Sequence, residues 1–164
     1  MKSQFDSNAK IMSWEATQLQ IEELQKAGKK VVFTNGCFDI VHLGHVDYLE
    51  KARNLGDFLV VGLNTDSSVS RIKGPFRPVC DEKSRSRVMA SFGFVDAVVF
   101  FDEPTPEQLI ETMKPDILTK GKDYEIENIV GADFVMKRGG KVETIPLIEG
   151  YSTSSVIHKI QQTS

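Results

Sequence analysis

The sequence predicts a single-domain α/β fold, in which five parallel strands form an open, doubly wound sheet. Short apolar runs rich in β-branched and aromatic residues recur five times along the 164 residues. Segments with helical spacing of apolar residues separate these runs, and parallel strands need such helical crossovers. No linker, repeat or low-complexity stretch divides the chain, and a chain of this length can bury about 70% of its extended surface. One self-sufficient core is therefore expected.

The predicted strands are short and are bounded by turn-forming residues. The first is a buried run of valine and phenylalanine that opens into the turn Thr34-Asn35-Gly36. In chain order, the strands are predicted over residues 31–33, 58–63, 97–101, 116–119 and 141–148.

The predicted helices carry recognisable start signals. Ser13 and Ser152 can each cap a helix, and Thr105 stands before Pro106 and Gln108 in the pattern of a capping box with proline at the first helical position. The helices are predicted over residues 13–27, 42–55, 65–72, 81–92, 129–137 and 152–162, with one more that begins at residue 105.

The charge balance argues against partners with bulk negative charge. Twenty Lys and Arg against 23 Asp and Glu give a net charge of −3. Neither nucleic acid nor a membrane is an expected partner, although a local cluster of cations could still hold phosphates. The two cysteines are far apart, no leader segment is evident, and no apolar run approaches the roughly 18 residues that cross a bilayer. A soluble cytoplasmic protein with reduced thiols is expected.

The segment after the first predicted strand, TNGCFDIVHLGH, carries two of the three histidines of the chain. His42 and His45 are three residues apart at a predicted helix start, so both rings can face one ligand in front of the helix. The free N–H groups and the positive dipole end of that helix favour an anion. Gly44 removes a side chain where a nucleotide could press against the backbone. The pattern predicts a phosphate-binding site at the carboxyl edge of the sheet.

Two other uses of these histidines fit the pattern less well. A histidine is often a structural residue, but two of the three histidines of this chain share one turn, which favours a functional role. Zinc is disfavoured, because no nearby cysteine or glutamate completes a tetrahedral site and the metalloprotease pattern spaces its histidines four apart.

This segment closely resembles the first motif of the cytidylyltransferase-like nucleotidyltransferases, whose HxGH histidines hold the phosphates of a nucleoside triphosphate. The resemblance continues through residues 62–79, 95–101, 115–124 and 149–160, and covers about 130 of the 164 residues. Within the family it is strongest to the adenylyltransferases that make ADP-heptose from heptose 1-phosphate for the lipopolysaccharide core. It implies a Rossmann-like nucleotidyltransferase fold and attack of a sugar phosphate on the α-phosphorus of ATP, with pyrophosphate released.

The resemblance also implies roles for particular residues. His42 and His45 are expected to donate hydrogen bonds to the phosphates, as imidazolium or in the tautomer turned inward, and Lys73 to reach over the substrate when its loop closes. Asp39 is expected either to orient a histidine or metal-bound water, or to be an uncapped loop carboxylate. The nucleotide- and phosphate-binding candidates are Thr34, Asn35, Gly36, Phe38, Asp39, Gly44, Ser152, Thr153 and Ser154. The sugar-phosphate candidates are Arg71, Arg85, Lys120, Lys122 and Asp123.

Cofactors, partners and domain division follow from the same resemblance. Mg²⁺ is expected to join through the phosphates and water, with few protein ligands. Residues 1–29 are predicted to form a helical extension and residues 30–164 the nucleotidyltransferase domain. A sugar kinase precedes this domain in longer members of the family, so a separate kinase is expected here. A homodimer or larger homo-oligomer is a family-level expectation.

Two rival functions remain open at this point. Glycerol-phosphate cytidylyltransferases, which use CTP, share the ending of this chain but carry an arginine where it has Leu147. That difference weakens the cytidylyl alternative and leaves one phosphate-binding charge to be supplied from elsewhere. A nucleotide-binding regulator without turnover is the alternative of another class. A dinucleotide-binding dehydrogenase is disfavoured, because no GxGxxG motif follows the first strand.

Overall fold

The computed structural model describes residues 5–163, so residues 1–4 and 164, the outer ends of the two predicted ranges, lie outside the described residues. The strands are β1 (Val31–Gly36), β2 (Phe58–Asn64), β3 (Ala97–Phe101), β4 (Ile117–Gly121) and β5 (Lys141–Ile145). The helices are α1 (Trp14–Lys26), α2 (Leu43–Arg53), α3 (Asp66–Lys73), α4 (Glu82–Ser91), α5 (Glu107–Met113), α6 (Ala132–Lys137) and α7 (Thr153–Gln162). Two short 3₁₀ helices, η1 (Ser7–Lys10) and η2 (Ile126–Asn128), complete the described elements.

All five strands of the sheet are parallel and lie in the order β3-β2-β1-β4-β5. The predicted doubly wound α/β fold is therefore confirmed. The chain builds outward from β1 in one direction through β2 and β3, and then crosses back to β4 and β5. The winding reverses between β1 and β4, where Val32 pairs with Ile117. At such a switch point the connections after the two strands diverge and leave a crevice at their carboxyl ends.

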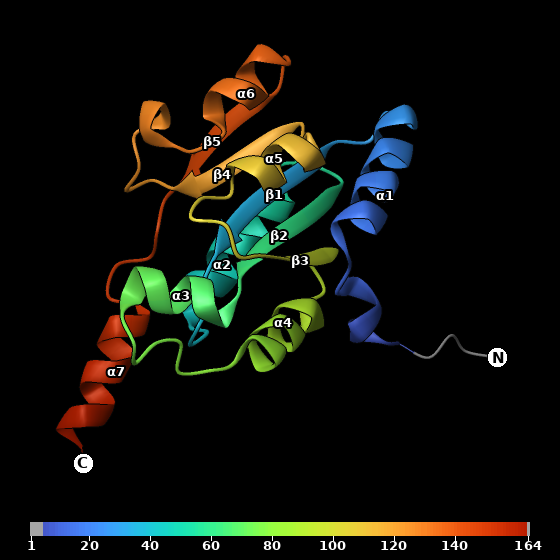
Figure 1. Cartoon of the computed structure of the whole chain (residues 1–164). Helices are drawn as coiled ribbons and strands as arrows, with labels where there is room; N and C mark the ends of the chain where they lie inside the picture. Colours follow the sequence, from blue (N-terminus) through green and yellow to red (C-terminus); the bar gives the residue numbers. More distant parts are fainter. Residues whose placement is uncertain (1–4, 164) are drawn as a thin grey trace.

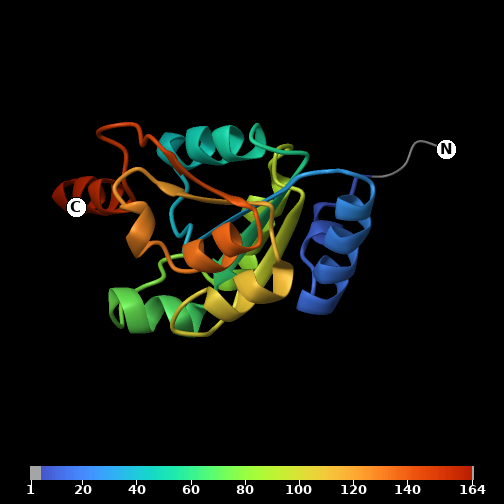
Figure 2. The same ribbon diagram turned by 90° about the horizontal axis from the view of Figure 1, so that it is seen from above.

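Helices cover both faces of the sheet and make a three-layered molecule (Figures 1 and 2). On one face, α1, α5 and α6 pack over a cluster that includes Phe33 and Val60. On the other face, α2 and α4 pack over Val32 and Leu59. Strands covered on both sides bury both sets of alternating side chains, which explains why the runs are apolar without a break. The seven residues of β2 are all buried.

The segment before β1 packs as part of the helical layer. Ile21 of α1 is 1% exposed and lies in the same core cluster as Phe33. The Trp14 indole Nε1 donates to the Phe100 carbonyl at 2.7 Å, and the Met12 amide donates to the Val98 carbonyl at 3.0 Å. These contacts tie the described part of the segment to β3 at the edge of the sheet.

Two predicted helix starts are wrong. α5 begins at Glu107 with Pro106 as the N-cap and without a side-chain cap, so Thr105 and Gln108 form no capping box. The reason is that the first helical hydrogen bond, from the Ile110 amide, ends on the Pro106 carbonyl. α6 begins at Ala132 rather than at residue 129, because Gly131 before it takes a left-handed conformation with φ of 84°.

Three predicted strand ends are also wrong. β1 continues through Asn35 and Gly36, which pair with Gly62 and Leu63 of β2 and so belong to the sheet rather than to a turn. β5 stops at Ile145 rather than at residue 148, because Pro146 follows and has no N–H to donate to a neighbouring strand.

β4 continues past residue 119 through Lys120 and Gly121, because these two residues pair with Thr144 and Ile145 of β5. The three differences decide which residues stand at the carboxyl edge of the sheet.

No helix among residues 5–163 is long and apolar enough to cross a membrane.

The turn that enters β5 offers a test of the packing. A Cβ at Gly140 would lie 2.7 Å from the Asp116 carbonyl oxygen and 2.7 Å from Val135 Cγ1, whereas a Cβ at Gly93 would meet nothing within 4 Å. Gly140→Ala should therefore lower the free energy of unfolding by about 1 to 3 kcal/mol through overpacking, and Gly93→Ala should change it by less than about 0.5 kcal/mol. Urea denaturation of both variants measures the difference. Equal stabilities would contradict the close approach of these backbones.

Candidate active site

A cavity of about 560 Å³ opens at the carboxyl ends of β1 and β4, where the winding of the sheet reverses. Its walls come from the segments that follow β1, β4 and β5, from the end of α3 and the loop after it, and from the first turns of α2 and α7. The predicted site residues that line it are Asn35, Gly36, Phe38, Asp39, His42, Gly44, His45, Lys73, Lys120, Asp123, Ser152, Thr153 and Ser154.

The two histidine rings stack at the start of α2. Their centroids are 3.9 Å apart and the ring planes differ by 25°. His42 is the N-cap of the helix, and its side chain makes no capping hydrogen bond. A Cβ at Gly44 would lie 2.9 Å from His42 Cε1 and 3.4 Å from Tyr151 Cβ, so the glycine makes room for the ring. The spacing predicted two rings on one side of the first turn, and the structure places them there.

Partial burial favours the neutral form of both rings. Desolvation lowers the pKa of His45 to about 4, with a smaller contribution from His42, and desolvation also lowers the pKa of His42. The Nδ1 atoms of both rings are buried, and neither has a hydrogen-bond partner among residues 5–163. Each ring in its neutral form retains one N–H donor.

A second helix start closes the cavity. Ser152 caps α7 by accepting a hydrogen bond from the Ser155 amide at 3.0 Å, which confirms the predicted cap. The Thr153 hydroxyl donates to the Ile40 carbonyl at 3.3 Å and so ties the first turn of α7 to the segment that precedes α2. Two helix N-termini thus contribute to one cavity, and each presents unbonded amides and the positive end of its dipole.

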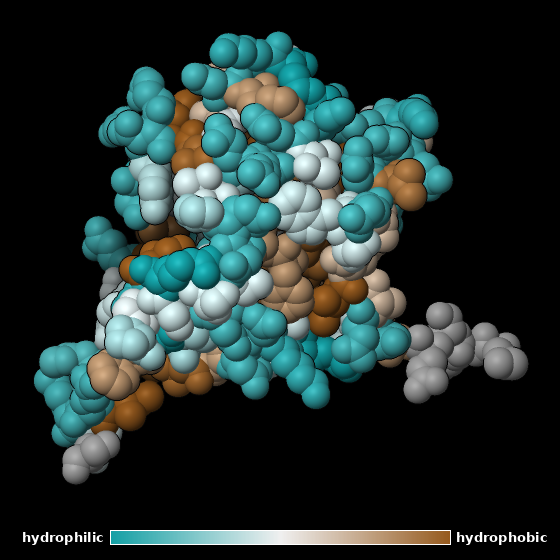
Figure 3. All heavy atoms as spheres, viewed as in Figure 1, coloured by the Kyte–Doolittle hydropathy of each residue, from teal (hydrophilic) through white to brown (hydrophobic). Residues whose placement is uncertain are grey.

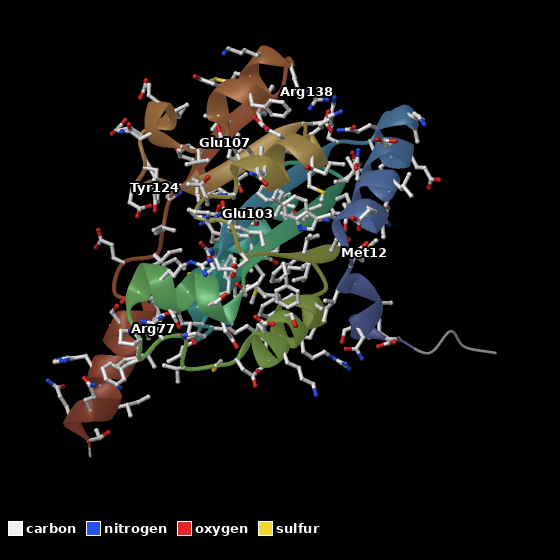
Figure 4. The ribbon with its side chains drawn as sticks, in the orientation of Figure 1. Met12, Arg77, Glu103, Glu107, Tyr124 and Arg138 are labelled. Carbon is white, nitrogen blue, oxygen red and sulfur yellow. The ribbon has the colours of Figure 1, made fainter. Side chains whose placement is uncertain are left out.

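The carboxyl end of β4 supplies a partly buried cation. The Lys120 ammonium donates to the Asn35 carbonyl at 3.2 Å and lies 5.6 Å from the centroid of the Tyr124 ring. Burial lowers the pKa of Lys120, against the opposing influence of Cys37 and Asp123. Tyr124 belongs to the turn after β4 and lines the cavity (Figure 4). Sequence reasoning did not single it out, although the motif that contains it was part of the resemblance.

Four predicted site residues do not line the cavity. Thr34 is buried, and its hydroxyl bonds to the Tyr48 hydroxyl at 2.8 Å beneath the cavity floor. Arg71 pairs with Asp102 at 3.1 Å outside the cavity. Lys122 is exposed beside the cavity. Arg85 is the fourth of these residues.

Arg85 is a structural residue, which corrects its place among the sugar-phosphate candidates. It is 1% exposed, and its guanidinium donates to the carbonyls of Cys37, Asn64 and Cys80 and to the Asp66 carboxylate. Because the guanidinium already donates to four acceptors, it has no free edge for a substrate. It fastens the ends of β1 and β2 to α4 instead.

Asp39 corrects two of the expectations for its carboxylate, because it bonds to no histidine and is not an uncapped loop carboxylate. It is 4% exposed and accepts from the amides of Val79 and Cys80 and from Arg77 Nε at 2.6 Å. Burial opposes ionisation, but these donors outweigh it and lower the pKa of Asp39. The carboxylate holds the loop after α3 against the segment that leads into α2.

Arg77 is the main residue that sequence reasoning missed. It lies in the loop between α3 and α4 and lines the cavity (Figure 4). The sequence signal was a second cation close to Lys73, in the segment Gly74-Pro75-Phe76-Arg77 that follows it.

The donor set of the cavity suits phosphates better than a protein-held metal. Among residues 5–163, no group of three or more His, Cys, Asp and Glu side chains lies close enough to hold a metal ion. Asp39 is fully engaged, which leaves Asp123 as the carboxylate of the lining that is open to a ligand.

Comparisons with known proteins identify the relatives of this chain. A family model described as cytidylyltransferase-like matches residues 33–159. The bifunctional protein HldE of Citrifermentans bemidjiense is 54% identical over 155 residues, which are 94% of this chain and 32% of that protein. The bifunctional protein HldE of Campylobacter jejuni is 58% identical over 138 residues, 84% of this chain and 29% of that protein. The chain thus spans about a third of the length of these curated relatives.

A solved structure is also similar. The crystal structure of the lipopolysaccharide core biosynthesis protein from Thermoplasma volcanium is 33% identical, with a TM-score of 0.59. The match covers 76% of this chain and 100% of that one.

The lowered pKa of His45 predicts a pH-dependent stability. Between pH 6.5 and pH 4, the unfolded chain binds a proton at this ring that the folded chain does not bind, so acid favours unfolding. Between pH 7 and pH 4.5, the free energy of unfolding should fall by about 2 to 3 kcal/mol more in the parent protein than in a His45→Gln variant. Urea denaturation at the two pH values measures this. An equal fall in both proteins would show that the ring titrates normally.

Proposed function

The chain belongs to the cytidylyltransferase-like family, and from this membership we propose that it transfers AMP from ATP to heptose 1-phosphate, giving an ADP-sugar and pyrophosphate. The observation that carries the proposal is the stacked pair His42 and His45 at the N-terminus of α2, inside the cavity at the switch point of the sheet. Such a site concentrates hydrogen-bond donors where a polyphosphate would lie.

Two comparisons support the sugar substrate. The HldE relatives match nearly the whole described chain, and the similar solved structure is titled as a lipopolysaccharide core biosynthesis protein. The motifs after β2 and β4 resemble those of the ADP-heptose branch. Leu147, in place of the arginine of the glycerol-phosphate cytidylyltransferases, lines the cavity and favours the adenylyl reaction over its CTP-dependent alternative.

The reaction proposed is a direct displacement at the α-phosphorus. An oxygen of the sugar phosphate forms a bond to the α-phosphorus, and the bond from that phosphorus to the bridging oxygen of the β-phosphate breaks. The electron pair leaves with the bridging oxygen, as pyrophosphate. The protein has to bring two polyanions in line and to stabilise the charge that develops on the α-phosphate and the leaving group.

The residues of the cavity divide this work. The rings of His42 and His45 donate N–H groups to the phosphate oxygens, and the first turn of α2 adds backbone amides. The first turn of α7, with Ser152, Thr153 and Ser154, faces the far phosphates. At the end of β1, the backbone of Asn35 and Gly36 lies beside the α-phosphate. The Phe38 ring packs edge-on against the His45 ring, with 5.3 Å between the two centroids, and supports it.

The sugar-phosphate side falls to residues at the carboxyl end of β4 and in the turn that follows it. Lys120 and Asp123 line that part of the cavity, where an ammonium and a carboxylate can meet a phosphate and sugar hydroxyls. Lys73, at the end of α3, is exposed at the cavity mouth and can reach over the bound substrates. Lys122 stays a prediction, because it is exposed beside the cavity rather than in it.

Mg²⁺ fits this site as a companion of the triphosphate. Asp123 is the open carboxylate of the lining, so the phosphates and water would complete most of the coordination. When bound, the ion supplies charge neutralisation to the triphosphate. The separate sugar kinase and the homodimer expected from the resemblance, and the cytoplasmic location expected from the composition, stay predictions.

The test is a substrate panel with detection of pyrophosphate. ATP and CTP are each supplied with heptose 1-phosphate and with glycerol 3-phosphate. Pyrophosphate release with ATP and heptose 1-phosphate alone supports the proposal. Release with CTP and glycerol 3-phosphate would favour the cytidylyl alternative, and ATP binding without release from any pair would indicate a regulator.

The histidine pair gives a sharper prediction. His42→Ala or His45→Ala should lower kcat by roughly 10² to 10⁴, because each change removes a donor that acts on charge developing in the transition state. His158→Ala is the matched control, since this third histidine is exposed on α7 and bonds to Gln162. Pyrophosphate release near the parental rate from either folded cavity variant would remove the pair from the mechanism.

A further inference from the structure

The loop between α3 and α4 is fixed against the entrance to α2 by one carboxylate. Asp39 accepts the Val79 amide at 2.9 Å and the Cys80 amide at 2.8 Å, and it accepts Arg77 Nε at 2.6 Å. The Ser70 hydroxyl of α3 donates to the Arg77 carbonyl, and within the loop the Arg77 amide donates to the Gly74 carbonyl at 3.1 Å. Both the backbone and the side chain of Arg77 are therefore held in place.

Only part of the Arg77 guanidinium forms hydrogen bonds. Its Nε pairs with Asp39, while its two terminal amino groups have no hydrogen-bond partner among residues 5–163. They are also not buried orphans, because the side chain retains 17% exposure and lines the cavity. An arginine held through Nε presents its terminal nitrogens as a fixed fork, and such a fork matches the geometry of a phosphate.

The position of Arg77 selects one end of the cavity. Its partner Asp39 precedes Ile40, whose carbonyl accepts the Thr153 hydroxyl of α7. Arg77 therefore belongs to the region where the segment before α2 meets the first turn of α7. Lys120 and Tyr124 stand at the end of β4 instead.

The cations of the cavity are unequally prepared for an anion. Lys73 is exposed, Lys120 is committed to the Asn35 carbonyl, and the segment after β5 contributes the apolar Leu147 and Ile148. Arg77 combines a cationic group, a fixed orientation and free donors. It can supply the charge that Leu147 does not.

We propose that Arg77 binds the β- and γ-phosphates of the nucleotide, and hence the departing pyrophosphate, with Asp39 as its positioning residue. The proposal rests on the proposed function for the identity of the nucleotide, and it adds a leaving-group residue to that site. Asp39 acts through Arg77 and does not touch the substrate.

The choice of variant separates ligand binding from folding. Arg77→Ala would leave a buried carboxylate without its cation, which can destabilise the loop for reasons unrelated to ligand. Arg77→Lys keeps a cation for Asp39, but a single ammonium then has to serve both the carboxylate and the phosphate. Arg87→Lys on α4 is the matched control, because Arg87 is exposed and does not line the cavity.

The test is calorimetric titration of the folded protein with inorganic pyrophosphate and, separately, with AMP. Arg77→Lys should weaken pyrophosphate binding about tenfold or more, the loss expected for charge-assisted hydrogen bonds to a phosphate, and should leave AMP binding unchanged. Arg87→Lys should bind both like the parent. Unchanged pyrophosphate affinity in Arg77→Lys, or an equal loss for AMP, would overturn the assignment.

A double variant tests the positioning role. Asp39→Asn should also weaken pyrophosphate binding, because the amide cannot accept from Arg77 Nε and both loop amides as a carboxylate does. If Asp39 acts through Arg77, the Asp39→Asn/Arg77→Lys protein should bind pyrophosphate about as weakly as Arg77→Lys alone. Additive losses would show that Asp39 acts independently and would refute its role as a positioning residue.

These outcomes stand apart from those of the substrate panel. If Arg77→Lys loses pyrophosphate binding but the parent turns over no substrate pair, the transferase proposal is contradicted and the anion site is supported. If the parent forms ADP-sugar but Arg77→Lys binds pyrophosphate as the parent does, the assignment of Arg77 is contradicted and the transferase proposal is supported.

Discussion

The reversal of winding between β1 and β4 is the constraint on which the site depends. Parallel strands end at one edge of the sheet, and the connections after β1 and β4 leave that edge toward opposite faces. The gap between them cannot be filled by either layer of helices. The segments that line the candidate site gather there: the first turn of α2, the turn after β4 and the start of α7. The apolar runs of the strands thus determine where the polar chemistry must lie.

The charged and polar groups of the cavity are partly neutralised by their surroundings. Partial burial lowers the pKa of both histidines and so favours their neutral forms, and Asp39 neutralises part of the charge of Arg77. A ligand-free site that was fully charged would be costly to bury, since each unpaired ion loses its hydration. Neutral N–H donors and helix dipoles carry no net charge, yet they favour an anion when it arrives. The chain can therefore be acidic overall and still hold a polyphosphate.

Local sequence signals predicted much of the candidate site. The features that depend on contacts between distant segments were not predicted. The stacking of His42 and His45 follows from three-residue spacing at a helix start, which the sequence displays directly. The pairing of Asp39 with Arg77 joins loops 38 residues apart, so no local pattern contains it. Arg85 shows the opposite failure, because a sequence cannot tell an arginine buried among carbonyls from one open to substrate. Strand ends were missed where Asn35 and Gly36 look like a turn but pair with β2.

The C-terminal helix is unlike the other elements of the site. Figure 1 shows α7 projecting from the body, none of its residues 153–162 is buried, and hydrophobic side chains show on its flank in Figure 3. Its first turn is nevertheless tied to Ile40 and forms one wall of the cavity. An element with so little packing detaches at a small free energy, well below that of global unfolding. Of the cavity walls, the wall formed by α7 is therefore the one that can move while the sheet stays folded.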